Sequence, residues 1–309
     1  MVENHLADWQ SRQLRDITRD MVAQRHTQIA SPKSATDLGS PVGANNVMRV
    51  LRALFNFANG QYEDEEGKSL FPDNPVSRLS HTRAWNPETR RQRIIKTVDL
   101  PAWFGAIQQL RKPEEQRVDW CSSTVADYLE FILFTGLRRD DALCLLWDQV
   151  DLKAKTMEPV IHKKQKTVMG FPLAEHVAAL LARRHSERVN DYVFPGREPF
   201  GKSGQSKRLD DPKKQIARVI ALSGVEFSSH DLRRTFITVA ESLDLSPFAL
   251  KRLCSHSAGS DVTAGYVIMD IERLRSPAEK ISRYLLRASS KEDSASVISI
   301  TDAEKRNQG

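Results

Sequence analysis

The sequence predicts a mainly α-helical protein that carries a small antiparallel β-sheet and divides into two domains. Apolar residues recur at helical spacing through most of the chain, most clearly from Ala44 to Ala58 and from Thr124 to Phe134. Shorter runs with strand character lie in the middle of the chain, between Trp147 and Leu173. A polar, basic and proline-containing segment from Trp85 to Lys96 has the composition of an interdomain linker. The 309 residues suffice for one large or two ordinary domains.

Composition and charge narrow the class of protein. Hydrophobic residues make up 40% of the chain and charged residues 28%, which is typical of a soluble globular protein. No apolar run approaches the length of a membrane span, and the first five residues do not begin a signal peptide. Cys121, Cys144 and Cys254 are odd in number and lack metal-binding spacing, which indicates a reducing cytosol. The net charge of +6 and the isoelectric point near 9.2 favour a polyanionic partner.

The first 85 residues are expected to form a small helical unit. Apolar residues between Leu6 and Leu14 suggest the end of one helix, and Thr18 is expected to cap a second helix. After a polar connection, Ala44 to Ala58 is expected to form an amphipathic helix with Arg49 and Arg52 on its flank. Taken alone, such a unit is a helical packing module, and nothing in its residues requires DNA binding.

The remainder of the chain predicts a larger unit in which helices surround a few short strands. A stretch rich in Gly, Ser and Lys from residue 197 to 212 is expected to be a loop, and the Ser-rich tail after Arg287 a flexible terminus. The expected helices are Ala102–Leu110, Thr124–Phe134, Ala174–Ser186 and Pro212–Leu222, and the expected extended segments are Trp147–Leu152, Pro159–Ile161, Thr167–Leu173 and Tyr192–Pro195.

Positive charge is concentrated after residue 90. Residues 1–90 hold 11 Lys and Arg against 11 Asp and Glu, so the whole positive excess lies downstream. Any single basic cluster is more simply explained as a solvated face, but their concentration in one part of the chain favours a surface that faces DNA. The clusters are Arg90-Arg91-Arg93-Lys96, Lys163-Lys164-Lys166, Arg183-Arg184-His185 and Lys202 to Lys214.

The strongest functional signal is a set of short motifs in the second part of the chain. A helix that begins with a Ser/Asp pattern near residue 229 carries His230 and Arg233 on one face of its first turns. A helix N-terminus with a guanidinium and an imidazole suits a phosphate. Upstream, the glycine of Thr135-Gly136-Leu137-Arg138 breaks an apolar helix just before an arginine. Downstream, His256 is followed ten residues later by Tyr266, a candidate nucleophile whose simpler interpretation is a core residue.

Taken in order, the Thr-Gly-Leu-Arg motif, a Lys-rich hairpin, the His-x-x-Arg motif, a second His and a Tyr resemble the tyrosine recombinases, or phage-type integrases. The resemblance is strong over residues 120–285 and looser from Asn45 to Trp85. It implies the two-domain tyrosine recombinase architecture, with a helical core-binding domain that clamps DNA and an α+β catalytic domain. The implied division is a partial core-binding domain at 1–85, a linker at 86–98, the catalytic domain at 99–288 and a flexible tail at 289–309.

The resemblance implies a site-specific DNA recombinase that cleaves and rejoins DNA through a 3′-phosphotyrosyl intermediate, for integration or excision of a phage or mobile element. Arg138 and Arg233 are expected to hold the nonbridging phosphate oxygens with permanently charged forks. His230 and His256 would donate to the same phosphate or take the proton of Tyr266, the nucleophile. Because the phosphotyrosine conserves the energy of the broken bond, no ATP, metal or other cofactor is required.

The general acid is expected in the Lys-rich hairpin. The family pattern places it eight residues before Pro172, at Lys164, and leaves Lys166 as the alternative. Asp141 aligns with an acidic residue that steadies the first arginine, although a carboxylate in a first helical turn is also a simple capping group. Asp231 has the same capping interpretation and receives no catalytic role. The residues expected to contact DNA are Arg49, Arg52, Lys163 and Arg234.

The partners that the resemblance implies are double-stranded DNA attachment sites, further copies of the chain in a tetramer on DNA, and accessory DNA-bending proteins. No membrane partner is expected, and the protein is expected in a bacterial cytoplasm, near the nucleoid, encoded by the bacterium or a phage. The amphipathic run from Met269 to Arg287 is expected to form a helix that docks on a neighbouring protomer. Only five residues precede Leu6, where the family pattern begins, so the chain is expected to be an N-terminally shortened member.

Other classes of protein compete with this interpretation. A metal hydrolase would use His230, His256 and a carboxylate, but the sequence has no His-x-x-x-His pair, and paired arginines would repel a cation. A helix-turn-helix transcription factor would need neither the hairpin lysine nor Tyr266. Within the family, the alternative is a DNA-binding remnant of an integrase that no longer recombines efficiently.

Overall fold

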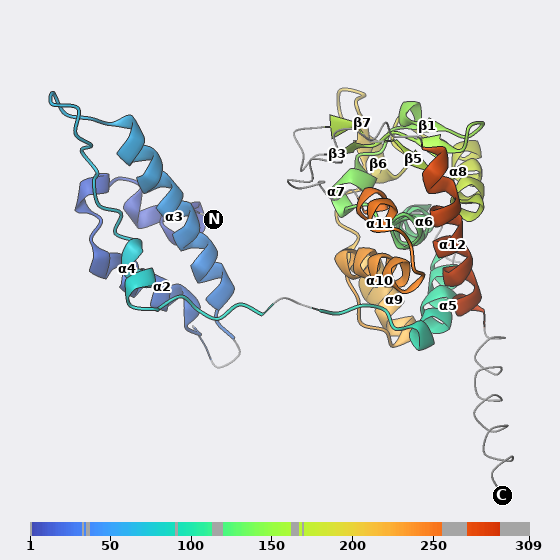
Figure 1. Cartoon of the computed structure of the whole chain (residues 1–309), viewed down its shortest axis with the longest axis horizontal. Coiled ribbons are helices and arrows are strands. Elements are labelled where there is room, and N and C mark those ends of the chain that lie inside the picture. The colour runs from blue at the N-terminus through green and yellow to red at the C-terminus, as the bar shows by residue number, and fades with distance from the viewer. Residues whose placement is uncertain are drawn as a thin grey trace, which may run out of the picture. The chain divides into compact units, whose positions relative to one another are not determined.

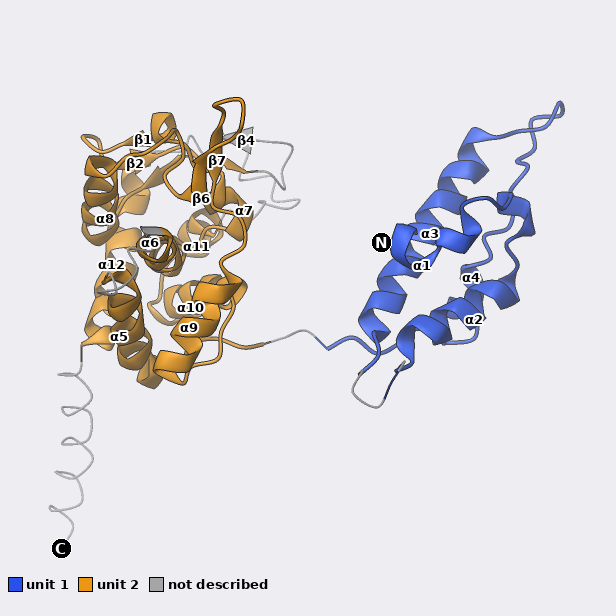
Figure 2. Ribbon diagram, turned by 180° about the vertical axis from the view of Figure 1, so that it is seen from behind, with its two compact units in different colours: residues 1–91 blue, residues 92–309 orange. Residues whose placement is uncertain are grey.

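The computed structural model describes residues 2–32, 34, 38–89, 92–112, 120–161, 167–168, 170–254 and 271–290. The chain (Figure 1) divides into two compact units, unit 1 with residues 1–91 and unit 2 with residues 92–309 (Figure 2). The division falls inside the segment 86–98 that the sequence predicts as a linker. Among the helices that the structure describes, none is both long enough and apolar enough to cross a bilayer.

Unit 1 is a small helical unit in which α2 packs against α3. The side chain of Thr18 caps α2 by accepting a hydrogen bond from the backbone nitrogen of Met21 at 3.2 Å, which confirms the predicted cap. The helix end predicted between Leu6 and Leu14 is wrong, because two separate 3-10 turns form there around the buried Trp9. The elements are α1 (Val2–His5), η1 (Ala7–Trp9), η2 (Leu14–Asp16), α2 (Arg19–Ala30), α3 (Pro41–Gln61) and α4 (Ser77–His81).

A polar cluster around the buried side chains of His26 and Asn45 ties the end of unit 1 to its helices. His26 Nε2 lies 2.8 Å from Asn45 Oδ1, and the same oxygen accepts a hydrogen bond from the backbone nitrogen of Asn86 at 3.1 Å. The amide of Asn45 donates to Glu88 Oε1 at 2.6 Å. Residues 86 and 88, which belong to the predicted linker, are therefore held by side chains of α2 and α3.

Unit 2 is built around α6, a helix that is apolar on nearly every face and is packed by α5, α8, α10 and α12 (Figure 1). Its side chains from Val125 to Phe134 are all almost fully buried. The helices predicted at 102–110, 124–134, 174–186 and 212–222 all form, with ends that differ by a few residues. The helices of unit 2 are η3 (Thr97–Asp99), α5 (Leu100–Arg111), α6 (Trp120–Thr135), α7 (Arg139–Leu143), η4 (Trp147–Gln149), α8 (Glu175–Ser186), α9 (Lys213–Ser223), α10 (Ser229–Ser242), α11 (Pro247–Leu253) and α12 (Glu272–Ser289).

The strands of unit 2 are short and antiparallel. One sheet has the order β1-β2-β5, in which Met157 pairs with both Val150 and Phe171, and two further pairs join β3 to β4 and β6 to β7. The strands are β1 (Val150–Asp151), β2 (Thr156–Met157), β3 (Val160–Ile161), β4 (Thr167–Val168), β5 (Phe171–Pro172), β6 (Pro195–Phe200) and β7 (Ser206–Arg208).

The sequence predicts these strands incompletely. The first half of the predicted strand Trp147–Leu152 is the 3-10 turn η4, β2 is missing from the prediction, and the predicted loop 197–212 contains most of the β6–β7 hairpin. The strands other than β6 have two or three residues, too few to show an alternating pattern, and β7 is polar throughout. Backbone pairing across the sheet defines them instead.

The apolar face of α12 packs within its own chain. Leu274, Ile281 and Leu285 are fully buried in the core of unit 2, where α12 lies against α5, α10 and β5. The predicted docking of this face on a neighbouring protomer is therefore wrong, because the periodic pattern shows that a face is buried and does not show against what. The helix continues through Ser289, and residues 291–309 of the predicted tail lie outside the described residues.

A close contact explains why α6 stops where it does. Gly136 follows the last residue of α6 and has a φ of 63°, in the left-handed region that favours glycine. A Cβ atom at this position would lie 2.3 Å from Cδ1 of Phe236 on α10. The predicted helix break is confirmed, and the missing side chain also lets α10 approach the turn that leads to Arg138.

Replacing Gly136 with Ala is expected to lower the free energy of unfolding by about 2 kcal/mol or more. A left-handed conformation costs an L-residue roughly 1–2 kcal/mol, and the collision with the Phe236 ring adds to this. Urea unfolding followed by circular dichroism measures the change.

Gly105 on α5 provides the matched control. This glycine is exposed, and an added Cβ would have no other atom within 4 Å. Gly105→Ala is expected to raise the free energy of unfolding by roughly 0.5–1 kcal/mol, because alanine favours a helix more than glycine does. Equal unfolding midpoints for the two variants would show that Gly136 is not constrained as described.

Candidate active site

The N-terminus of α10 places the first two candidate residues. Ser228 is the N-cap, and both its backbone nitrogen and its hydroxyl donate to Asp231 Oδ2, at 3.0 and 2.8 Å. His230 follows in the first turn and is exposed, whereas Arg233 is buried with 3% of its surface accessible. The local capping signal therefore positions an imidazole at the surface directly beside a buried guanidinium.

Arg233 connects three parts of unit 2 that are far apart in the sequence. Its Nη1 donates to the backbone oxygen of Gly136, and its Nη2 donates to the backbone oxygen of Cys254, next to the end of α11. These two bonds join the Thr-Gly-Leu-Arg turn, α10 and the start of the segment that carries His256. Because a guanidinium has five N–H donors, two bonds fix its plane and leave donors for an anion.

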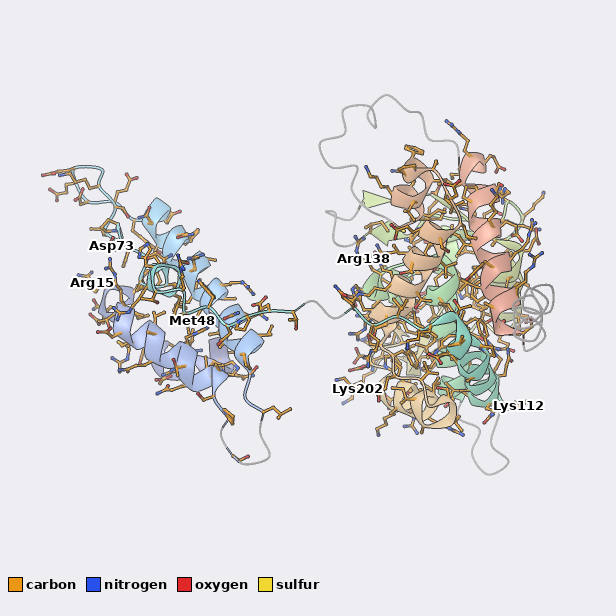
Figure 3. All side chains as sticks on the ribbon, turned by 60° about the horizontal axis from the view of Figure 1, so that its bottom comes forward. Arg15, Met48, Asp73, Lys112, Arg138 and Lys202 are labelled. Carbon is orange, nitrogen blue, oxygen red and sulfur yellow. The ribbon has the colours of Figure 1, made fainter. Side chains whose placement is uncertain are left out.

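Arg138 lies close to Arg233 and reaches the surface of unit 2 (Figure 3). It is the N-cap residue of α7, and its Nη1 lies 3.8 Å from Oδ2 of the buried Asp141 in the first turn of that helix. Burial, and after it the charge of Arg138, lowers the pKa of Arg233 to about 10, which still leaves Arg233 a cation at neutral pH. Two cations held this close together repel each other, so an anion bound beside them would stabilise the site.

The charge of this site also acts on His230. Partial burial, followed by the charges of Arg234 and Arg233, lowers the pKa of His230 below its ordinary value of 6.5, and Asp231 opposes the shift only in part. The imidazole is therefore neutral at pH 7 and can either donate or accept a proton through its two nitrogens.

Asp231 is fixed from several directions. Arg234 donates to its Oδ1 at 3.1 Å, and Arg93 donates to its Oδ2 at 3.1 Å. Burial raises the pKa of Asp231, but the hydrogen bonds from Ser228 and Arg93 outweigh burial and hold the pKa below its ordinary value. The predicted capping role of Asp231 is confirmed, and its contact with Arg93 is an addition that the sequence did not indicate.

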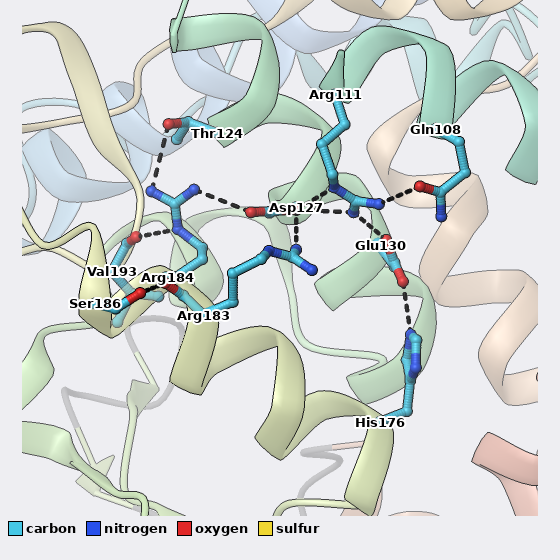
Figure 4. Close-up of polar contacts among 10 residues, drawn as sticks. All are labelled: Gln108, Arg111, Thr124, Asp127, Glu130, His176, Arg183, Arg184, Ser186 and Val193. Atoms are coloured by element: carbon cyan, nitrogen blue, oxygen red, sulfur yellow. Dashed lines mark hydrogen bonds and ion pairs between the residues drawn. The ribbon is translucent and has the colours of Figure 1, made fainter.

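A buried charge network supports the helix that leads to Arg138 (Figure 4). Asp127 and Glu130 lie on α6, facing Arg111 on α5 and three residues on α8. Glu130 accepts from Arg111 and lies 2.6 Å from His176 Nε2, while Asp127 accepts from Arg111 at 2.8 Å, from Arg183 at 2.6 Å and from Arg184 at 3.2 Å. The sequence signal for this network was the presence of two carboxylates inside an otherwise apolar helix.

Two of the basic clusters are not simply solvated or DNA-facing. Arg184 is 4% exposed and donates to Asp127 and to the backbone oxygen of Val193. Arg93 pairs with Asp231. The interpretation of Arg184 as part of a DNA-facing surface is therefore wrong, because its guanidinium group is held inside unit 2 by buried acceptors, whereas the side chain of Arg93 remains 37% accessible.

The candidate DNA contacts of unit 1 also have intramolecular partners. Arg49 donates to Glu88 Oε1 at 2.8 Å, and Arg52 donates to Ser80 Oγ at 2.9 Å. Both guanidinium groups lie over the ring of Trp85, with 5.8 and 5.5 Å between the guanidinium carbon and the ring centroid. Any phosphate contact of Arg49 has to compete with Glu88.

The structure brings together Arg138, Asp141, His230, Arg233 and Arg234. The other predicted residues of unit 2, Lys163, Lys164, Lys166, His256 and Tyr266, lie outside the described residues.

Replacing Arg234 with Ala is expected to raise the pKa of His230, because a nearby positive charge disfavours the imidazolium. NMR titration of the His230 ring measures the shift. The pKa of His230 is lower in the folded protein than in the unfolded chain, so the neutral imidazole stabilises the fold at pH values above its ordinary pKa. This stability is lost as the pH falls through the folded pKa, and acid therefore weakens the folded state. Arg234→Lys retains the charge and is expected to titrate like the wild type. Identical curves for all three proteins would show that His230 does not sense the charge at position 234.

Comparison with known proteins agrees with the motifs and the fold. The sequence model of the Phage integrase family matches residues 109–270. The prophage integrase IntF of Escherichia coli K12 is 25% identical over 264 residues, which cover 84% of this chain and 52% of that protein. The integrase of Salmonella phage P22 is 29% identical over 140 residues, 42% of this chain and 36% of the relative. The chain thus spans about half, or less, of the length of these relatives.

Solved structures share the fold. A post-cleavage complex of the XerH site-specific recombinase with palindromic difH substrate has a TM-score of 0.60 and 18% identity, covering 94% of this chain and 77% of that one. A lambda integrase dimer bound to a core site has a TM-score of 0.53 and 17% identity, covering 83% and 84%. Since the family model matches more than half of the chain, over the part that carries both arginine motifs, this protein belongs to the phage integrase family of tyrosine recombinases.

Proposed function

We propose that this protein is a site-specific DNA recombinase that breaks and rejoins DNA strands through a 3′-phosphotyrosyl intermediate. The observation that carries the proposal is the position of Arg233, whose guanidinium bonds to the backbone at Gly136 and Cys254 and lies beside Arg138. The similar solved structures of XerH and lambda integrase are complexes with DNA, which supports DNA as the partner here.

The paired arginines suit a phosphodiester. A diester carries one negative charge, and more charge collects on its nonbridging oxygens as the nucleophile attacks. Arg138 and Arg233 would meet that charge with groups that are already fixed, since Asp141 holds the first and two carbonyl oxygens orient the second. Preorganised charge of this kind lowers the barrier, because little rearrangement is needed during the reaction.

The reaction is a transesterification that needs no external energy source. The phenolic oxygen of Tyr266 would attack the phosphorus and form a new P–O bond, while the bond from phosphorus to the 5′ oxygen breaks. His230, neutral at pH 7, or His256 would accept the phenolic proton, and Lys164 would give a proton to the leaving 5′ oxygen. A 5′-hydroxyl of a second strand then attacks the phosphotyrosine and releases Tyr266.

The substrate would be a pair of double-stranded attachment sites, recombined during integration or excision of a phage or mobile element. Exchange between two duplexes breaks four strands, and each strand needs one tyrosine, so four copies of the chain would assemble on DNA. Accessory DNA-bending proteins would assist that assembly. Unit 1 would contribute contacts to the DNA backbone, with Arg49 exchanging Glu88 for a phosphate.

Replacing Tyr266 with Phe is expected to retain DNA binding and to abolish the covalent protein–DNA adduct, because only the nucleophilic oxygen is removed. The measurement is a shift on a denaturing gel after incubation with DNA that contains an attachment site and a nick that traps the intermediate. A normal adduct yield in this variant would exclude Tyr266 as the nucleophile. A wild-type protein that binds such DNA but forms no adduct on it would contradict the proposed function.

Replacing Lys164 with Ala is expected to slow cleavage of ordinary DNA, and a sulfur atom in place of the scissile 5′ oxygen is expected to restore the rate. A thiolate leaves without a proton, so the substitution bypasses only the general acid. Lys166→Ala is the matched control and should show no specific rescue. Rescue of Lys166→Ala in place of Lys164→Ala would assign the acid to Lys166.

A further inference from the structure

Arg93 contacts the helix that carries His230 and Arg233. Its Nε donates to Asp231 Oδ2 at 3.1 Å, and its Nη1 donates to Glu226 Oε2 at 3.0 Å. The two acceptors differ in exposure, because 3% of the Asp231 side chain is accessible and 71% of the Glu226 side chain is. The contact with Asp231 is therefore the shielded one, and water screens the contact with Glu226.

A second bond fixes the same stretch of chain. The backbone nitrogen of Ile95 donates to Thr235 Oγ1 at 2.9 Å, and that hydroxyl donates in turn to the backbone oxygen of Asp231 at 2.9 Å. Ile95 itself is buried in the core of unit 2. Residues 93–95, where the chain enters unit 2, are thus held along the first two turns of α10.

Asp231 lies between the two candidate catalytic residues and defines the start of their helix. Its Oδ2 accepts from both the backbone nitrogen and the hydroxyl of Ser228, in addition to Arg93. A buried carboxylate needs cationic or hydrogen-bonding partners to remain charged and fixed. Among the described residues two arginines contact this carboxylate, and loss of Arg93 leaves only Arg234, which bonds to the opposite oxygen.

We propose that Arg93 is a positioning residue for strand cleavage: it fixes Asp231 and the first turn of α10, and so sets the orientation of His230 and Arg233 toward the scissile phosphate. This proposal rests on the recombinase activity proposed above. Small displacements of groups that stabilise a transition state reduce rate strongly while leaving substrate binding intact. A positioning role would therefore lower the cleavage rate and leave DNA binding unchanged, whereas a direct contact between Arg93 and DNA would contribute to binding.

The test is single-turnover cleavage of nicked attachment-site DNA by the full chain, at saturating DNA and well below the melting temperature. Arg93→Ala is expected to lower the rate constant by about tenfold or more, with the DNA dissociation constant and the fraction of protein that reacts unchanged. Arg93→Lys keeps a cation beside Asp231 and is expected to recover part of the rate. Glu226→Gln removes only the exposed partner and is expected to stay within about twofold of the wild type.

Each alternative gives a different result. Weaker binding and a smaller salt dependence in Arg93→Ala, with a normal rate at saturation, would mean that Arg93 contacts a phosphate, and would overturn the proposal. A reduced reacting fraction with a normal rate constant would mean that Arg93 only stabilises the fold, and would overturn it as well. A wild-type protein that forms no Tyr266-dependent adduct would instead remove the proposed function on which the inference rests.

Discussion

The structure of the site depends on one buried cation that bonds to backbone oxygens. Arg233 joins Gly136 at the end of α6 to Cys254 at the end of α11, across sequence separations of 97 and 21 residues. Carbonyl acceptors orient the guanidinium and leave its charge in place, whereas a carboxylate partner would neutralise that charge. A lowered pKa, caused by burial and by Arg138, is the electrostatic consequence of holding two cations together. The arrangement keeps positive charge available for an anion.

Other arginines of unit 2 are paired with buried carboxylates, so they support the fold and are not available to bind an anion as Arg233 is. Arg111, Arg183 and Arg184 share the buried Asp127, so their charges serve to lock α5 and α8 onto α6. Replacing such pairs by apolar side chains often costs little stability, whereas breaking one partner is costly. Their directional bonds instead fix the angle and register of α6, and thereby the turn that carries Gly136 and Arg138.

The segment between the units is bound at both of its ends. Asn86 and Glu88 are held by side chains of unit 1, and Arg93 and Ile95 by α10 of unit 2. Composition alone suggests a solvated connection, because Arg, Asn, Glu and Pro are common in linkers. The same residue types also form specific hydrogen bonds and ion pairs wherever the fold provides a partner.

The sequence by itself determined the elements whose causes are local: the cap at Thr18, the apolar periodicity of α6, the glycine break at Gly136 and the positions of His230 and Arg233 on the first two turns of α10. Spacing along a helix and the φ preference of glycine depend only on neighbouring residues. Tertiary structure alone decided which partner each charge found and which surface each apolar face covered. Arg93 meets Asp231 across 138 residues, and α12 is buried against its own unit, because packing brings together groups whose separation no local pattern encodes.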